Sequence, residues 1–358
     1  MSNIACGERH SISVDNWHRG WACGNNSFCQ LGVGPELFTD FMIVPKLPEI
    51  RAVAVGRNHT VFVCTNGRVW VCGSNRYGQL GITQEFFPGV REMIIDPIII
   101  SATCGGSSTF LLTQYGQVYS CGFNSCFQLG HYERKKILKP LLIPNLPPVA
   151  QISCGCEHTF FLDTEGNVWG CGNNAFGQLS VGDFESHKVL QIIPLSWDVV
   201  YICCGTDFSL FLDRSGSVYS CGCNYDGQLG IGNDSNQNTG QQIHGLPPIC
   251  KLAAGTSHTL FLEKSGPLWG CGSNRLEQLC FPLGSVPGEH LSPVIIPLDK
   301  EIQTIACGPD YSVLWSEQSY LASGAWDHEQ FGIRNSWKMA KLFHMKLLVV
   351  SLILLLLL

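Results

Sequence analysis

Histidine stands directly before a hydroxyl residue at four regularly spaced places in the chain. The pairs are His10–Ser11, His59–Thr60, His158–Thr159 and His258–Thr259. A histidine beside a serine or threonine could act as the base for a nucleophilic hydroxyl, provided that a third group orients the imidazole. No Asp or Glu recurs beside these pairs, and the matching positions in the other copies hold Ser108, Phe208 and Tyr311. The pattern therefore favours a structural hydrogen bond tying adjacent strands over catalysis.

Cysteines are the second group that could do chemistry, and the chain has 19 of them. Eleven directly precede a glycine: Cys6, Cys23, Cys72, Cys104, Cys121, Cys154, Cys171, Cys204, Cys221, Cys271 and Cys307. Zinc sites need paired Cys-x₂₋₄-Cys spacings, and close pairs such as Cys154–Cys156 and Cys221–Cys223 do not fit. Free cysteine is a small, often buried hydrophobe. We therefore expect packing roles for these thiols, with no metal and no cofactor.

These residues recur because the chain consists of repeats of about 50 residues. The first anchor glycine of each copy is Gly7, Gly56, Gly105, Gly155, Gly205, Gly255 or Gly308. The second anchor glycine is Gly24, Gly73, Gly122, Gly172, Gly222, Gly272 or Gly324. A glutamine follows six residues later in every copy: Gln30, Gln79, Gln128, Gln178, Gln228, Gln278 and Gln330. Seven copies in one register predict a repeat architecture.

Each copy is typical of short β-strands. Residues 59–72 form two β-rich runs around Asn66–Gly67, a two-residue hairpin signal. Such units cannot bury their faces alone, so they must stack or close into a ring. We predict an all-β, seven-bladed β-propeller over residues 1–338 and a hydrophobic tail over residues 339–358. Because the chain starts at the strand Ile4–Cys6, inside a unit, we expect residues within Ile333–Phe343 to supply that unit's outer strand, joining the two termini in one blade.

The unit Cys-Gly-x-x-His-Ser/Thr, followed by Gly-Gln-Leu-Gly, resembles the repeat of the regulator of chromosome condensation family. The resemblance covers residues 4–332, although Cys23 and its five equivalents stand where the family commonly has Trp. It implies a protein partner, because the family's founding activity is guanine-nucleotide exchange on the small GTPase Ran. That exchanger carries a protruding insertion and a basic N-terminal tail, and we expect neither here.

Resemblance between repeats supports the fold more strongly than the activity. We therefore expect a protein-interaction scaffold or regulator, with a small GTPase as the candidate partner and no covalent catalytic machinery. A guanine-nucleotide exchange factor for a Ran-like GTPase is the alternative. We expect the protein to be a monomer.

The two residues after each first anchor glycine vary freely in chemistry. In the family's fold they would ring one mouth of the central channel, and propellers bind partners through loops on one face. The candidate partner-binding rim consists of Glu8, Arg9, Arg57, Asn58, Glu157, Asp207 and Asp310. A rim that is merely solvated is the alternative.

Charge and composition narrow the partners and the compartment. The net charge of −6 and a pI near 6.0 give no basic footprint for nucleic acid. The one basic stretch, His131–Lys139, is expected to be a solvated loop. The N-terminus lacks the basic start and apolar run of a signal peptide. We therefore expect a reducing compartment, the cytoplasm or alternatively the nucleus, with most thiols free.

The C-terminal segment is separate from the repeats. Leu347–Leu358 consists of Leu, Val and Ile with one Ser, and Lys341 and Lys346 precede it. Twelve helical residues span about 18 Å, short of the roughly 30 Å of a hydrocarbon core. The segment could nevertheless anchor the protein if lysines reached the interface. A membrane-tethered adaptor, a truncation or transcript end, and packing onto the propeller remain alternatives.

Overall fold

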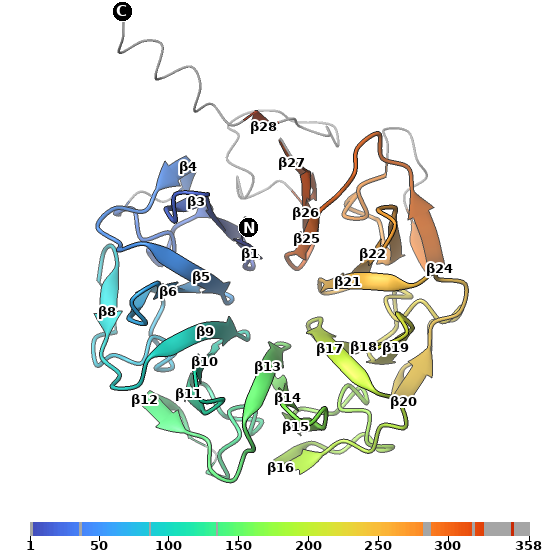
Figure 1. Ribbon diagram of the computed structural model, residues 1–358, viewed down its shortest axis with the longest axis horizontal. Coiled ribbons are helices and arrows are strands. Elements are labelled where there is room, and N and C mark those ends of the chain that lie inside the picture. The colour runs from blue at the N-terminus through green and yellow to red at the C-terminus, as the bar shows by residue number, and fades with distance from the viewer. Residues whose placement is uncertain are drawn as a thin grey trace, which may run out of the picture.

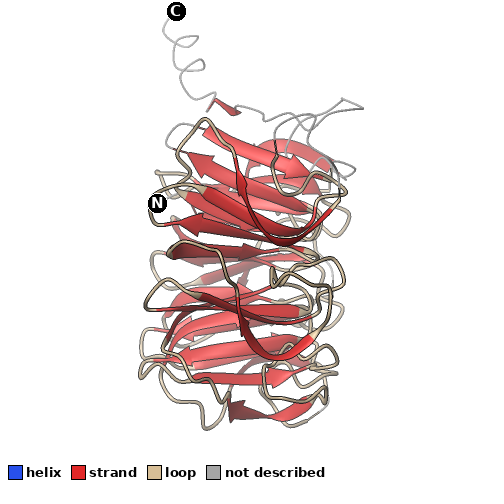
Figure 2. Cartoon of the chain, turned by 90° about the vertical axis from the view of Figure 1, so that its right-hand side faces the viewer, coloured by secondary structure: helices blue, strands red, loops and turns tan. Residues whose placement is uncertain are grey.

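Seven four-stranded antiparallel sheets surround a central axis, as Figure 1 shows. This computed structural model describes residues 3–35, 38–85, 87–133, 135–281, 288–316, 319–325 and 345–346. From the side the ring is a disc with loops on its two faces (Figure 2). The predicted all-β, seven-bladed propeller is confirmed. Within the described ranges, no helix is long and apolar enough to cross a membrane.

Each blade is one continuous stretch of chain that runs from the innermost to the outermost strand. The first three blades comprise β1 (Asn3–Cys6), β2 (His10–Val14), β3 (Gly20–Asn25) and β4 (Phe38–Ile43); β5 (Ile50–Val55), β6 (His59–Cys64), β7 (Val69–Gly73) and β8 (Arg91–Met93); and β9 (Ile99–Cys104), β10 (Ser108–Thr113), β11 (Val118–Gly122) and β12 (Ile137–Leu142). The fourth and fifth comprise β13 (Val149–Cys154), β14 (His158–Asp163), β15 (Val168–Gly172) and β16 (His187–Ile192); and β17 (Val199–Cys204), β18 (Phe208–Asp213), β19 (Val218–Gly222) and β20 (Gln237–Gln242). The sixth and seventh comprise β21 (Ile249–Ala254), β22 (His258–Glu263), β23 (Leu268–Ser273) and β24 (Glu289–Ile296); and β25 (Thr304–Cys307), β26 (Tyr311–Ser316), β27 (Ser319–Gly324) and β28 (Met345–Lys346).

This strand order corrects the expected closure of the ring. All four strands of the first blade come from residues 3–43, and the seventh blade uses residues 304–346. The two termini therefore do not share a blade, because the first strand is already the innermost one and its outer partners follow it in sequence. Residues 333–343 lie outside the described residues. Met345–Lys346, within the predicted tail, pairs with β27 of the seventh blade.

The hydrophobic cores lie between blades. Every residue of β6 and β14 is buried, since the second strand of a blade packs on both neighbouring blades. Phe62 of blade 2 belongs to the core of blade 1, and Phe161 of blade 4 packs into the core of blade 3 beside Phe110. Alternate side chains of one strand point to opposite faces of its sheet. Each blade therefore completes the cores on both sides of it, and the ring folds as a unit.

The repeated histidine joins blades rather than strands within one blade. Its Nε2 lies 2.9–3.1 Å from the hydroxyl of the next blade in the pairs His10–Thr60, His59–Thr109, His158–Ser209 and His258–Ser312. That hydroxyl donates to a glutamine carbonyl, as from Thr60 Oγ1 to Gln30 O at 2.7 Å. Since the hydroxyl proton is used there, Nε2–H must be the donor. Burial disfavours a second proton on the ring, so the imidazole is neutral. The structural role is confirmed, but the partner lies about 50 residues away.

Asparagine and glutamine fasten the turn after the third strand. The Oδ1 atom of Asn75 accepts the backbone N–H of Leu80 at 2.9 Å, and the Oε1 atom of Gln79 accepts that of Tyr77 at 2.9 Å. The same two bonds recur in blades 1 to 6. These side-chain oxygens accept backbone N–H groups of the turn, which have no partner in a neighbouring strand. The Gly-Gln-Leu-Gly pattern is therefore a turn signal.

The cysteine before the second anchor glycine packs against the preceding blade. Five of these thiols lie 3.2–3.8 Å from the backbone carbonyl oxygen of the turn glutamine in the preceding blade: Cys72, Cys121, Cys171, Cys221 and Cys271. All 19 cysteines are free thiols. Burial raises the pKa of the Cys171 thiol to about 12, so the thiol is protonated at neutral pH. These cysteines act as small packing residues, as predicted.

Tyr311 closes the ring between blades 7 and 1. It occupies the histidine position of the last blade and is 1 % exposed. Its hydroxyl lies 3.0 Å from Gly7 O, 2.9 Å from His10 O and 3.1 Å from Ser11 Oγ. Side-chain hydrogen bonds and the packing of β1 beside β25 therefore join the two ends of the chain.

We expect Tyr311→Phe to lower the free energy of unfolding by about 1–3 kcal/mol, because it removes a buried hydroxyl that forms hydrogen bonds between blades 7 and 1. Urea unfolding measures this difference. Tyr115→Phe, on an exposed turn, is the matched control and should change the stability by less than about 0.5 kcal/mol. Equal effects of the two substitutions would show that the Tyr311 hydroxyl does not hold the ring closed.

The histidine bonds predict a dependence of stability on pH. Burial lowers the pKa of His10, His158 and His258 from 6.5 to about 3 and that of His59 to about 4. Below pH 6.5 the unfolded chain therefore binds protons that the folded chain does not. Stability is fully present above pH 6.5 and falls as the pH drops toward 4, by up to about 1.4 kcal/mol per pH unit for each histidine.

The measurement is the free energy of unfolding between pH 7.5 and pH 5. His59→Gln should lower the slope of the free energy of unfolding against pH by the equivalent of about one bound proton. His244→Gln, on an exposed link, should leave this slope unchanged. An unaltered slope in His59→Gln would mean that this imidazole is not held neutral in the folded ring.

Candidate functional site

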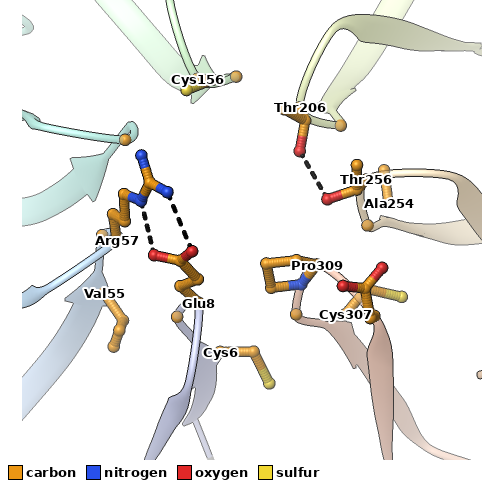
Figure 3. Close-up of a pocket in the computed structure, with 18 of the residues that line it drawn as sticks. Cys6, Glu8, Val55, Arg57, Cys156, Thr206, Ala254, Thr256, Cys307 and Pro309 are labelled. Atoms are coloured by element: carbon orange, nitrogen blue, oxygen red, sulfur yellow. Dashed lines mark hydrogen bonds and ion pairs between the residues drawn. The ribbon is translucent and has the colours of Figure 1, made fainter. Parts of the chain in front are cut away.

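A cavity of about 540 Å³ lies on the axis of the ring. It opens on the face that carries the loops between the first and second strands of the blades, here called the channel-mouth face. The first anchor glycines and the residues that follow them line it, as Figure 3 shows. The loops that the sequence marked as variable therefore meet in one place.

Backbone hydrogen bonds join these loops around the axis. Arg57 N donates to Gly106 O at 3.1 Å, Cys156 N to Thr206 O at 3.0 Å, and Thr256 N to Pro309 O at 2.9 Å. Each bond crosses from one blade to the next. The residue after each glycine is thereby fixed, so its side chain projects from a rigid support, as binding sites require.

Glu8 and Arg57 form a salt bridge across blades 1 and 2. Arg57 Nε donates to Glu8 Oε2 at 2.6 Å, and Arg57 Nη2 donates to Glu8 Oε1 at 3.1 Å (Figure 3). The Arg57 side chain is 58 % exposed. An ion pair at such exposure contributes at most about 1 kcal/mol to stability. Its main effect is that the two charges neutralise each other on this side of the mouth.

On blades 4 and 5 the rim carries negative charge, which comes from the carboxylates of Glu157 and Asp207. Neither carboxylate has a salt-bridge partner among the described residues. Glu157 Oε2 accepts from Asn173 Nδ2 at 3.3 Å and lies 3.4 Å from Cys126 Sγ. Burial, and then the nearby Glu157 charge, raise the pKa of Asp207. This side of the rim is therefore an uncompensated acidic sector.

The remaining predicted rim residues lie in the same loops. Glu8, Arg9, Arg57 and Asp310 line the cavity, whereas Asn58, Glu157 and Asp207 lie beside it and outside its lining. The carbonyl groups of Arg9, Asn58 and Asp310 accept backbone N–H bonds from the segments after the third strands, at 2.8–2.9 Å. The structure thus brings the candidates to one face.

Sequence reasoning missed an apolar group on this face. Phe28, Tyr225 and Leu276 are 45 %, 66 % and 49 % exposed, and Leu276 lines the cavity. The rings of Phe176 and Tyr225 lie 6.0 Å apart, edge to face. The signal was available, because Phe28, Phe176 and Leu276 each stand two residues before the glutamine of the turn. Exposed aromatic and aliphatic side chains beside charges are typical of protein interfaces.

The chemistry of the site favours binding. The cavity wall includes a ring of inner-strand side chains: Cys6, Val55, Cys104, Cys154, Cys204, Ala254 and Cys307. Burial raises the pKa of Cys6, Cys104 and Cys204 to about 12, and burial and nearby carboxylates raise that of Cys156 to about 11. Such thiols are poor nucleophiles at neutral pH. In the described part of the chain, no three His, Cys, Asp or Glu side chains are placed to hold a metal ion.

Comparisons with known proteins agree with this architecture. The family model of the RCC1-like domain matches residues 39–351. No curated protein matches the chain significantly.

Two solved structures illustrate the likeness of the fold. Human WBSCR16 is 24 % identical, with 88 % of this chain and 87 % of that chain covered and a TM-score of 0.79. Prp20p from Saccharomyces cerevisiae is 23 % identical, with 88 % and 83 % covered and a TM-score of 0.80, and its structure was reported with its binding properties to Gsp1p and histones.

We expect Glu157→Gln to lower the pKa of Asp207, because it removes the neighbouring negative charge while burial remains. The value should stay above that of an exposed aspartate. Carbon-13 titration of the Asp207 carboxyl group measures the change. Glu165→Gln is the matched control, since it removes a carboxylate charge on the opposite face of the disc, and it should leave Asp207 unaffected. If the pKa of Asp207 is the same in Glu157→Gln as in the unaltered chain, the two carboxylates do not form one acidic sector.

Proposed function

The chain belongs to the RCC1-like domain family, and on this premise we propose that it is a protein-docking module that regulates a small GTPase through its channel-mouth face. The observation that carries the proposal is the rim itself. Rigid loops hold the carboxylates of Glu157 and Asp207, which have no salt-bridge partner among the described residues, on the same face as the exposed side chains of Tyr225 and Leu276. Such a surface offers apolar area for affinity and charge for orientation.

Two considerations support a protein partner. The structure of Prp20p was reported with its binding properties to Gsp1p and histones, which are proteins. The exposed apolar side chains of the rim also come from separate turns, in blades 1, 5 and 6, and such side chains beside charges are typical of protein interfaces. The choice of a small GTPase rests on the family's founding activity.

Docking without exchange is the form of regulation that we favour. The described rim contains no element comparable to an inserted wedge. Glu8 and Arg57 pair with each other, and Glu157 and Asp207 lie beside the mouth. Nucleotide exchange needs a group that disturbs the phosphate and Mg²⁺ contacts of the GTPase. A scaffold needs only complementary surface and rigid loops.

The double variant Glu157→Gln/Asp207→Asn should weaken capture of the GTPase by roughly tenfold, because it removes the acidic sector without removing volume. Titration calorimetry or a surface-binding assay measures the affinity. Glu165→Gln/Asp96→Asn, which neutralises two carboxylates on the opposite face, is the matched control. Unchanged affinity in the first variant, or an equal loss in the control, would remove the rim from the interface.

Release of labelled GDP separates a scaffold from an exchange factor. We expect the protein to bind a member of a panel of Ran-like and Rab-like GTPases without accelerating release. Acceleration that Glu157→Gln/Asp207→Asn abolishes would instead identify an exchange factor acting through the same rim. Failure to bind any member of the panel would refute the choice of partner.

A further inference from the structure

The face opposite the channel mouth, here called the far face, carries a second group of exposed apolar side chains. Trp17, Ile94, Ile98 and Tyr115 are 58 %, 78 %, 52 % and 72 % exposed. Trp17 and Tyr115 stand in the turns between the second and third strands of blades 1 and 3. Ile94 and Ile98 begin and end the link from β8 to β9. They belong to three consecutive blades.

Hydrogen bonds hold the Trp17 indole outward. Asp15 Oδ1 accepts the backbone N–H groups of Trp17 and Arg19 at 2.9 Å each, which fixes the turn. The Arg19 guanidinium lies 4.8 Å from the Trp17 ring centre and also pairs with Asp15 at 2.8 Å. The largest apolar side chain of the far face is therefore presented to solvent on a rigid turn.

The two aromatic side chains of this group stand on far-face turns of blades 1 and 3. The turn position of Trp17 and Tyr115 holds Glu165, Ser215 and Ser265 in blades 4, 5 and 6. Among the described residues, none of these turns in blades 4 to 6 exposes a large hydrophobic side chain, although strand ends such as Ile192 and Ile295 do. The repeat does not require these residues, since the other blades form the same turn without them.

The chemistry of the sector fits the interfacial region of a lipid bilayer. Tryptophan and tyrosine favour the level of lipid headgroups, because each has an apolar body and a polar atom. The side chains stand on separate turns rather than in a groove, so each could enter a soft surface without a complementary partner. Nearby charges balance, with Arg19, Lys46, Arg51 and Arg68 against Asp15, Glu49, Glu92 and Asp96.

A second observation comes from the end of the chain. β28 (Met345–Lys346) pairs with β27 in blade 7, and blade 7 packs beside blade 1, which carries Trp17. The apolar run Leu347–Leu358 follows β28 directly in sequence. We propose that the far face of blades 1 to 3 lies on a lipid bilayer, that Leu347–Leu358 enters the same bilayer, and that the channel-mouth face stays open to its protein partner.

Flotation of the full chain with phosphatidylcholine vesicles, with and without phosphatidylserine, tests the proposal. The variant Trp17→Ser/Ile94→Ser/Tyr115→Ser, with residues 347–358 intact, should lower the vesicle partition coefficient by roughly tenfold. Because the sector is electrically balanced, binding should persist at high salt. Phe28→Ser/Tyr225→Ser/Leu276→Ser, on the channel-mouth face, is the matched control and should bind vesicles like the unaltered chain. Thermal unfolding checks that each variant folds.

Each other outcome overturns the proposal. Absence of vesicle binding by the full chain would exclude a lipid surface. Undiminished binding of the triple far-face variant, with loss on ending the chain at Lys346, would assign membrane attachment to the tail alone. Equal losses of vesicle binding in both triple variants would show that the far face is not the membrane-binding surface. Concentration-dependent self-association that the far-face variant abolishes, measured without vesicles, would identify a second copy of the chain as the occupant.

Discussion

The distance between consecutive anchor glycines is the constraint on which the ring depends. A Cβ atom at Gly56 would lie 2.8 Å from Gly105 O and 2.1 Å from the His59 ring, and Gly155 and Gly255 are equally confined. Only a residue without a side chain lets the inner loops approach this closely. The approach brings each histidine within reach of the next blade's hydroxyl, and that hydroxyl within reach of the glutamine carbonyl. Glycine, histidine, hydroxyl and glutamine therefore recur together because each bond requires the others.

Much of this could be predicted from the sequence, because the repeat samples each requirement seven times. The anchor glycines, the hairpin turns and the packing role of cysteine follow from residue types and spacing. What spacing could not supply was the partner of each bond. His10 lies beside Ser11 in sequence and bonds to Thr60. The closure of the ring was mispredicted for the same reason, since strand patterns do not say which strand is innermost.

Some of the hydrogen bonds that recur from blade to blade are missing in single blades. Trp21 and Trp169 donate their indole N–H groups to Asp15 and Asp163. Trp70 has Cys64 in the acidic position, and its buried Nε1 atom has no hydrogen-bond partner in the described structure. Ser108 is shorter than the histidine it replaces, and Thr159 Oγ1 in the next blade has no hydrogen-bond partner in the described structure. The fold tolerates single defects because the other blades keep the ring closed. Positions can therefore vary without loss of the scaffold.

Sevenfold repetition also explains why function must come from the residues that the repeat leaves free. Identical blades would give every sector of the disc the same surface, so a partner could not be oriented on it. Glu8 and Arg57 neutralise each other on blades 1 and 2, whereas Glu157 and Asp207 leave blades 4 and 5 acidic. On the far face, the turns of blades 1 and 3 carry Trp17 and Tyr115, whereas the matching turns of blades 4 to 6 carry polar residues. Because both asymmetries are fixed to one rigid disc, a far face held on a bilayer would determine which way the acidic sector points. A GTPase docked on the opposite face would then have a defined orientation relative to the membrane.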